Sequence, residues 1–220
     1  MVYAMTLLGA IDVISYFDID EETGAGILVD PGAEPEKLEG IIEERRFQIE
    51  AIFLTHGHFD HIGGVAEVAH FLAEKNPAKG PVPVYIHENG RKYLTDPAWN
   101  LSSQFGNQIL LQDSDDLTLH AVQDGEEILL SSGKKYRVIH TPGHTTDSIL
   151  YYNEAEGYAF SGDTIFRGSV GNDRFPGGDG RALWQSIREK VFTLPEETVL
   201  LSGHSEPTTV AEEKRRYRRT

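Results

Sequence analysis

The amino-acid sequence predicts a layered α/β (α+β) fold in which strands alternate with helices and with hairpins. Short apolar runs rich in Val, Ile, Leu and Tyr recur along the chain, and each run ends in a turn. Between some of these runs, apolar residues recur at helical spacing. The chain has 220 residues, of which 39% are hydrophobic, and its composition does not shift along its length. We therefore expect one domain, residues 1–220, with a single substantial core.

The expected elements follow the chain in order. The apolar runs predict strands at 25–32, 50–57, 82–88, 135–144, 148–154, 157–163 and 198–204. Helical spacing predicts helices at 34–46, 63–75 and 178–194. The segments 17–26 and 152–158 are expected to join neighbouring strands as antiparallel hairpins. Strands interleaved with helices pack as layers, so we expect a mixed, layered sandwich. Residues 95–120 are the least regular part, and a long loop of this kind often borders a site.

Composition excludes several classes of function. The formal net charge is −15, which repels a phosphate backbone, so nucleic acid is not expected as a partner. The chain has no cysteine, which excludes disulfides, a thiolate nucleophile and thiolate metal ligands. Residues 1–20 lack a basic leader region, and no apolar run approaches the roughly eighteen residues of a membrane span. We expect a cytoplasmic protein that does not enter a membrane.

The stretch "AIFLTHGHFDHIGG" at 51–64 concentrates histidines directly after an apolar run. In an extended chain His56 and His58 lie on one side about 6.6 Å apart, so both imidazoles can converge on one ion. Asp60 and His61 then turn away with the bend into the following helix, and the two glycines that come next allow tight packing. A solvated polar loop would not require the further histidines and aspartate found downstream. The spacing therefore predicts a cluster that serves two metal ions.

Three other apolar runs end in a residue that can bind metal. They lead into His144, Asp163 and His204. Layered α/β folds place their sites at such strand ends, so we expect these residues to join the first cluster.

The motifs "THGHFDH", "TPGHT", "FSGDT" and "LSGH", in this order, resemble those of the metallo-β-lactamase superfamily. The likeness runs from about residue 26 to residue 209. The phrases "VDPGAEPEKLE", "SGDTIFRGSVG" and "PTTVAEE" are most similar to the short bacterial branch related to hydroxyacylglutathione hydrolase, or glyoxalase II. The resemblance implies a four-layer αββα sandwich with a pair of metal ions at one edge of its two sheets.

The resemblance also implies a role for each matching residue. The first metal would be bound by His56, His58 and His144, and the second by Asp60, His61 and His204. Both metals would be bridged by Asp163. Asp60 and Asp163 would be the catalytic carboxylates, and Asp30 would orient a ligand imidazole from behind.

Imidazole and carboxylate ligands suit two divalent ions, with zinc expected first and iron or manganese tolerated. A metal pair lowers the pKa of a shared water from 15.7 toward about 7, which makes hydroxide available for attack on an acyl carbon. The sequence contains no G-x-S-x-G motif, the turn that carries the nucleophilic serine of α/β-hydrolases. The resemblance to glyoxalase II implies a small acyl thiol as substrate, such as S-D-lactoylglutathione. The leaving thiol of such a substrate, with a pKa near 8.5, would depart without a general acid.

The sequence departs from its branch at two places. The segment "GNDRFPGG" stands where R-T-D-x-P-G is common, so Asn172 and Arg174 are candidate substrate-binding residues. Asp147 stands where glycine is more usual. The basic stretch 214–220 is read as a solvated helix end or a frayed tail rather than a clamp for substrate carboxylates.

Other functions stay open at this point. Persulfide dioxygenases share these motifs but use one iron, which would be held by His56, His144 and Asp163. A hydrolase of another ester or a lactone is a further alternative. A binding module without catalysis is disfavoured, because an unbroken ligand set without metal would be destabilising. The remaining histidines are expected to be structural or at the surface: His70, His87, His120 and His140.

Overall fold

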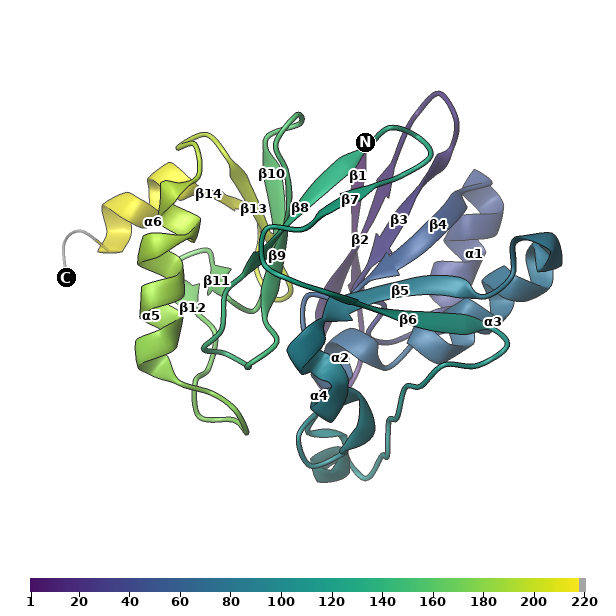
Figure 1. Cartoon of the computed structure of the whole chain (residues 1–220), viewed down its shortest axis with the longest axis horizontal. Helices are drawn as coiled ribbons and strands as arrows, with labels where there is room; N and C mark the ends of the chain where they lie inside the picture. The colour runs from purple at the N-terminus through teal and green to yellow at the C-terminus, as the bar shows by residue number, and fades with distance from the viewer. Residues whose placement is uncertain (218–220) are drawn as a thin grey trace.

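The structure, a computed structural model, describes residues 1–217 and consists of four layers. Two sheets face each other at the centre, and helices cover their outer sides (Figure 1). This is the four-layer arrangement that the resemblance implied. None of the helices within residues 1–217 is long and apolar enough to cross a bilayer.

The first sheet has six strands in chain order. Its strands are β1 (Val2–Leu7), β2 (Val13–Ile19), β3 (Ala25–Val29), β4 (Gln48–Phe53), β5 (Val82–His87) and β6 (Leu117–Val122). β1, β2 and β3 pair antiparallel, whereas β3 to β6 are parallel. The helices α1 (Pro35–Arg45) and α3 (Val65–Lys75) cover its outer face. The parallel strands therefore bring their carboxyl ends to one edge.

The second sheet is mainly antiparallel. Its order is β14 (Thr208–Thr209), β13 (Val199–Ser202), β10 (Tyr158–Gly162), β9 (Ile149–Asn153), β8 (Lys135–His140) and β7 (Glu127–Leu129). The helices α5 (Gly180–Glu189) and α6 (Val210–Tyr217) cover it from outside. A small ribbon of β11 (Ile165–Phe166) and β12 (Ser169–Val170) and the short helices α2 (Phe59–Ile62) and α4 (Arg91–Thr95) complete the fold.

Strand alternation explains the layering. In β3, Ile27 and Val29 point into the core between the sheets, while Leu28 packs under the helices of the first sheet. In β9, Tyr151 points between the sheets and Leu150 points toward the outer core of the second sheet. Both faces of these strands are buried, which is why their sequences are continuous apolar runs. The expected strands of the two central layers are confirmed.

The structure corrects two expectations and agrees with a third. Residues 117–120 were expected inside a long loop, but they belong to the edge strand β6 over Leu117–Val122, whose exposed positions are His120 and Ala121. The helix expected at 178–194 ends at Glu189 and continues as a 3₁₀ turn over Val191–Thr193. Residues 214–217 of the basic stretch belong to α6, and residues 218–220 lie outside the described part of the chain.

Candidate metal centre

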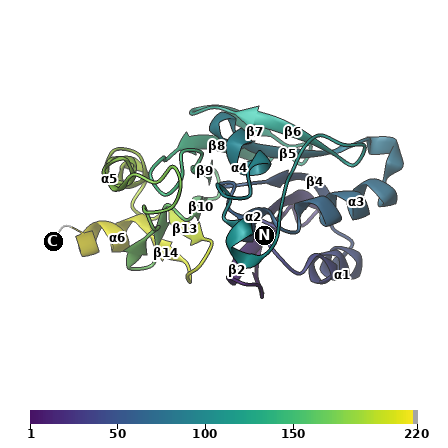
Figure 2. The same ribbon diagram turned by 90° about the horizontal axis from the view of Figure 1, so that it is seen from below.

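The seven predicted ligands come together at one edge of the two sheets. They follow the ends of β4, β8, β10 and β13, with two of them on α2, which lies between the two halves of the molecule (Figures 1 and 2). The side chains form three overlapping groups whose ligand atoms lie within 4.8 Å of one another. The groups are His56, His58 and His144; His56, His61 and Asp163; and Asp60, His61 and His204.

The first group consists of three imidazoles. The Nε2 atoms of His56 and His144 lie 3.1 Å and 3.0 Å from Nδ1 of His58. All three rings are buried. Burial, together with neighbouring imidazoles, lowers the pKa of His58 to about 3 and holds that of His56 well below its usual value. The rings are therefore neutral at pH 7, and neutral nitrogens are the form that binds metal.

The second group pairs imidazoles with carboxylates. Nε2 of His204 lies 3.2 Å from Oδ2 of Asp60 and 3.3 Å from Nε2 of His61. Burial alone would lower the pKa of both imidazoles, but the surrounding carboxylates outweigh it: they raise the pKa of His204 to about 10 and that of His61 well above its usual value. Protons therefore balance the carboxylate charge here, at positions where a divalent cation would do the same.

Asp163 connects the two groups. Its Oδ2 lies 3.6 Å from Nε2 of His144 and 3.3 Å from Nε2 of His204, and its Oδ1 lies 3.4 Å from Nε2 of His61. Burial opposes ionisation, but the histidines hold the pKa of this carboxyl well below its usual value. A single carboxylate thus faces the first and the second group at once.

Contacts behind the rings select the tautomer that metal binding needs. Nδ1 of His144 donates to the carbonyl of Asn172 at 2.7 Å, and Nδ1 of His204 donates to the carbonyl of Asp12 at 2.7 Å. Nδ1 of His61 donates to Oδ2 of Asp30 at 2.8 Å. Each bond occupies Nδ1 and turns Nε2 into the cluster, which is the arrangement typical of metal-binding histidines. A metal ion bound there would replace the protons that the Nε2 atoms of His61 and His204 carry without it.

Asp30 lies behind two imidazoles rather than one. Its Oδ1 accepts from the Thr55 amide at 2.8 Å, and its Oδ2 accepts from the Thr55 hydroxyl at 2.6 Å as well as from His61. The same hydroxyl contacts Nδ1 of His56 at 3.2 Å. Asp30 has a φ of 49°, a left-handed conformation that aspartate and asparagine tolerate better than most residues.

The donor set fits divalent metal ions. Five imidazoles and two carboxylates face one another, and the buried Oδ1 of Asp163 has no hydrogen-bond partner among the described residues. Neutral nitrogen lone pairs about 3 Å apart repel unless a cation or a proton lies between them. The cluster can therefore hold metal, and nitrogen and oxygen ligands admit zinc, iron or manganese.

Aromatic side chains around the cluster escaped the sequence analysis. The ring of Phe175 lies 5.5 Å from that of His58, nearly perpendicular to it, and Phe166 lies 5.9 Å from His204. Tyr93 lies 5.9 Å from His58, and its hydroxyl accepts from the Thr146 amide at 3.0 Å. No sequence spacing marks these residues, because they come from α4, β11 and the loop after β12, which only the fold brings to the cluster.

The two candidate substrate residues occupy different positions. The carbonyl of Asn172 holds His144, and its side-chain oxygen accepts from the amide of Arg174 at 3.0 Å. Asn172 thus shapes the loop, whereas the side chain of Arg174 is exposed and precedes Phe175 directly.

The remaining histidines lie outside the three groups. His70 is exposed beside Asp116, at 3.0 Å. His87 stacks on His140 with ring centroids 3.8 Å apart, and His120 stacks on Tyr85.

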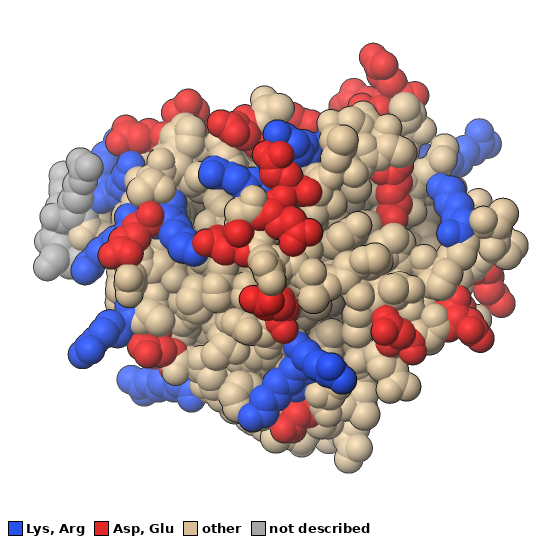
Figure 3. Space-filling model, viewed as in Figure 1, with Lys and Arg blue, Asp and Glu red and all other residues tan. Residues whose placement is uncertain are grey.

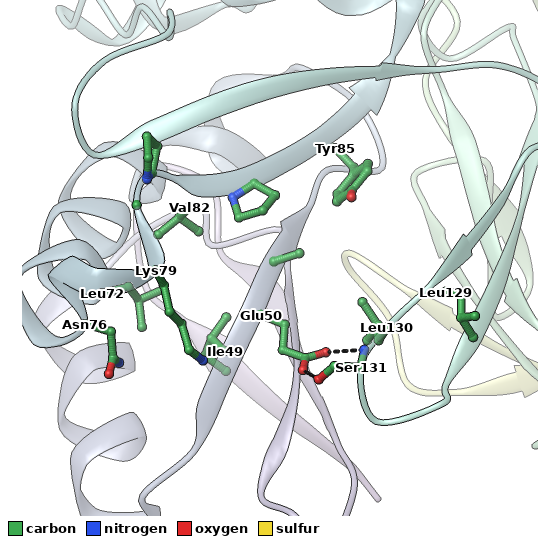
Figure 4. A pocket seen from close by; sticks show the side chains of 14 residues that line it. Ile49, Glu50, Leu72, Asn76, Lys79, Val82, Tyr85, Leu129, Leu130 and Ser131 are labelled. Carbon is green, nitrogen blue, oxygen red and sulfur yellow. Dashed lines mark hydrogen bonds between the residues drawn. The ribbon is translucent and has the colours of Figure 1, made fainter.

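A separate surface pocket lies at the amino ends of β4 and β5, the opposite ends of the strands from the cluster. Its lining is mainly apolar and includes Ile49, Val82 and Leu130 (Figure 4). The carboxylate of Glu50 is engaged there by the amide and hydroxyl of Ser131. This pocket contributes nothing to the metal-binding groups.

Comparisons with known proteins agree with this geometry. Residues 15–204 match the family described as the metallo-beta-lactamase superfamily. The chain is 36% identical over 210 residues to the probable metallo-hydrolase YqgX of Bacillus subtilis, covering 94% of this chain and 92% of that protein. It is 33% identical over 197 residues to hydroxyacylglutathione hydrolase GloC of Haemophilus influenzae, covering 89% and 87%.

Two solved structures are similar over nearly the whole chain. The B3 metallo-beta-lactamase BLEG-1 has a TM-score of 0.85 at 33% identity, covering 98% of this chain and 97% of that one. TTHA1623 in a di-iron-bound form has a TM-score of 0.77 at 33% identity, covering 97% of both chains. With its fold, its His/Asp metal-binding cluster and these relatives, the chain belongs to the metallo-β-lactamase superfamily, a family of metal-dependent hydrolases.

Proposed function

We propose that this protein hydrolyses thioesters, such as S-D-lactoylglutathione or a related acyl thiol, with two divalent metal ions. The observation that carries the proposal is the position of Asp163 between a trio of imidazoles and a mixed group of imidazoles and carboxylate. The name of the GloC relative supports the choice of substrate.

Each residue has a defined task in this proposal. His56, His58 and His144 would hold one ion; Asp60, His61 and His204 would hold the other; and Asp163 would contact both. Bound divalent ions supply an acidified water and positive charge beside the acyl oxygen. The carboxylates of Asp60 and Asp163 would orient that water and take up its proton as its oxygen bonds to the acyl carbon. The carbon–sulfur bond would then break, with the sulfur leaving as a thiolate that takes up a proton. The products are a carboxylate and a thiol.

The rim of the cluster suggests how the substrate lies. The ring of Phe175 borders the first group and offers an apolar surface to the acyl chain. The exposed cation of Arg174, one residue earlier, is available to an anionic group on the thiol. The guanidinium of Arg167 forms an ion pair with Glu206 at 2.5 Å, so Arg174 is the better candidate of the two for binding an anionic group of the substrate.

The proposed setting is the cytoplasm, and the proposed partner is a small molecule rather than nucleic acid. On the face shown in Figure 3, acidic and basic side chains are interspersed among the described residues, in keeping with the net charge of −15. Such a surface favours no polyanion.

Turnover of lactoylglutathione by the metal-loaded protein tests the proposal. Arg174→Ala should raise KM about tenfold with little effect on kcat, because the cation binds substrate without touching the reacting atoms. Arg188→Ala, which removes an exposed arginine on α5, is the matched control and should change neither constant. A protein that carries two metal ions and cleaves no thioester would refute the proposed substrate.

A persulfide dioxygenase activity is the second candidate, and one observation favours it. His56, His144 and Asp163 converge, so the three residues that would hold a single iron are in place. Oxygen separates the two candidates, because hydrolysis continues under nitrogen whereas dioxygenation of glutathione persulfide stops. Asp60→Ala gives a second test, since it removes a residue that only the two-metal mechanism uses.

A further inference from the structure

Asp147 is a buried carboxylate without a hydrogen-bond partner. It lies in the loop between His144 and β9, its side chain is 0% exposed, and no donor in good geometry reaches either of its oxygens. None of the ion pairs formed by the described residues includes it. A carboxylate in such surroundings is costly unless something positive offsets its charge.

The carboxylate packs against the turn that carries two predicted ligands. Its Oδ2 lies 3.4 Å from the position that a Cβ on Gly57 would occupy and 3.1 Å from the equivalent position on Gly90. Gly57 separates His56 from His58, so the charge lies directly behind the first imidazole group. The side chain of Tyr93 fills the remaining space beside Gly57.

The surroundings keep the charge available near neutral pH. Burial raises the pKa of Asp147 to about 7; the Thr145 hydroxyl and the amides of Asp147 and Gly57 lie near its oxygens without good hydrogen-bond geometry, and they oppose the rise only in part. A cation held by the neighbouring imidazoles would favour the charged form further.

We propose that Asp147 is a positioning residue that sets the His56–Gly57–His58 turn and strengthens cation binding at the first imidazole group through its buried charge. The inference rests on the metal sites of the proposed function but not on the thioester substrate.

Asp18 provides a matched comparison. It is equally buried, but its carboxylate accepts from the hydroxyls of Tyr136 and Tyr158 and lies 2.9 Å from the ammonium of Lys134. This network lies between the sheets and includes none of the metal-binding groups. Removal of its charge should therefore disturb folding and leave metal binding unchanged.

The experiment measures zinc affinity and metal-free stability of the full chain, for wild type and for Asp147→Asn, Asp147→Gly and Asp18→Asn. Competition with a chromophoric chelator at pH 8 gives the affinity for Zn²⁺, and thermal unfolding gives Tm. Asp147→Asn and Asp147→Gly should weaken zinc binding by the first imidazole group by about 10- to 100-fold, the range for residues behind a ligand. Their metal-free Tm should stay equal or rise, because an unpaired buried charge has been removed. Asp18→Asn should lower Tm with zinc affinity unchanged within about twofold.

The two readouts separate the proposal from a structural role. Unchanged zinc affinity in both Asp147 variants overturns it, and so does a lower metal-free Tm in both, which would show that the carboxylate stabilises the fold itself. A wild-type chain that binds no zinc, iron or manganese would overturn the metal sites together with this inference. A wild-type chain that binds zinc tightly and cleaves no thioester would overturn only the proposed substrate.

Discussion

Asp30→Asn should weaken metal binding by the second group, because asparagine cannot reproduce the contacts of the carboxylate. The side-chain oxygen of the introduced asparagine must stay opposite the N–H of Thr55, whose position the backbone fixes. Its NH₂ group therefore takes the place of Oδ2 and faces Nδ1 of His61. Two donors then oppose each other. His61 relieves the conflict by moving its proton to Nε2, which removes the lone pair directed at the metal. The backbone is not strained, since asparagine tolerates the φ of 49°.

The size of the effect follows from the lost contact. A hydrogen bond to a charged group contributes about 1.5–3 kcal/mol, and each 1.4 kcal/mol is about tenfold in affinity. We therefore expect zinc or iron affinity at the second group to fall about 10- to 100-fold, with the first group changed less. Chelator competition at fixed pH measures both constants.

A matched control comes from the surface. Asp116 accepts from Nδ1 of His70 at 3.0 Å in an exposed pair of the same chemistry, so Asp116→Asn changes a similar contact away from the cluster. It should leave both metal affinities unchanged. Equal affinities for Asp30→Asn and wild type would refute the tautomer argument.

Three more predictions concern the cluster and the fold around it. Asp163→Ala should remove both ions in elemental analysis and lower thioester turnover more than about 100-fold, whereas His70→Ala should change neither. Gly143→Ala should lower Tm by roughly 3–12 °C, because φ is +140° and a Cβ would lie 2.2 Å from the α5 backbone; Gly40→Ala in α1, where a Cβ meets nothing within 4 Å, should not. The pKa of His204 is raised to about 10, so its contribution to metal-free stability is fully present below about pH 6.5 and is lost as the pH rises through 10. Denaturant unfolding at several pH values should show this loss of stability, and His204→Gln should remove the pH dependence.

The central strands were predictable because their chemistry is uniform. Ile27, Leu28 and Val29 are buried on both faces, which produces a continuous apolar run that a sequence reveals. The edge strand β6 escaped because burial does not alternate along it: only Leu117 and Val122, at its two ends, are buried. β14 has two residues and β7 has three, too few for any period to appear. Edges and short strands depend on the partner strand, which is information that the local sequence does not carry.

The ligand residues were predictable for a similar reason, since imidazoles and carboxylates at strand ends form a recognisable pattern. The groups that hold these ligand side chains in place were not predictable. The carbonyls of Asn172 and Asp12 hold His144 and His204, and a backbone carbonyl leaves no signature in the residue type. Asp147 was noticed only as an unusual residue, because its burial behind Gly57 depends on three loops meeting.

The distribution of ligands over the fold has a consequence for stability. His56 and His58 follow the first sheet, while His144, Asp163 and His204 follow the second, and each of the three groups draws on both halves. Metal bound by any group therefore links the two sheets, and the linkage exists only in the native state. Free metal at 100 times its Kd should add about 2.7 kcal/mol to the free energy of unfolding, whichever group is filled. Denaturant unfolding with and without zinc measures this gain. Asp163→Ala should lose most of it, because the remaining ligands hold metal weakly, whereas a gain as large as that of wild type would show that zinc stabilises the protein from somewhere else.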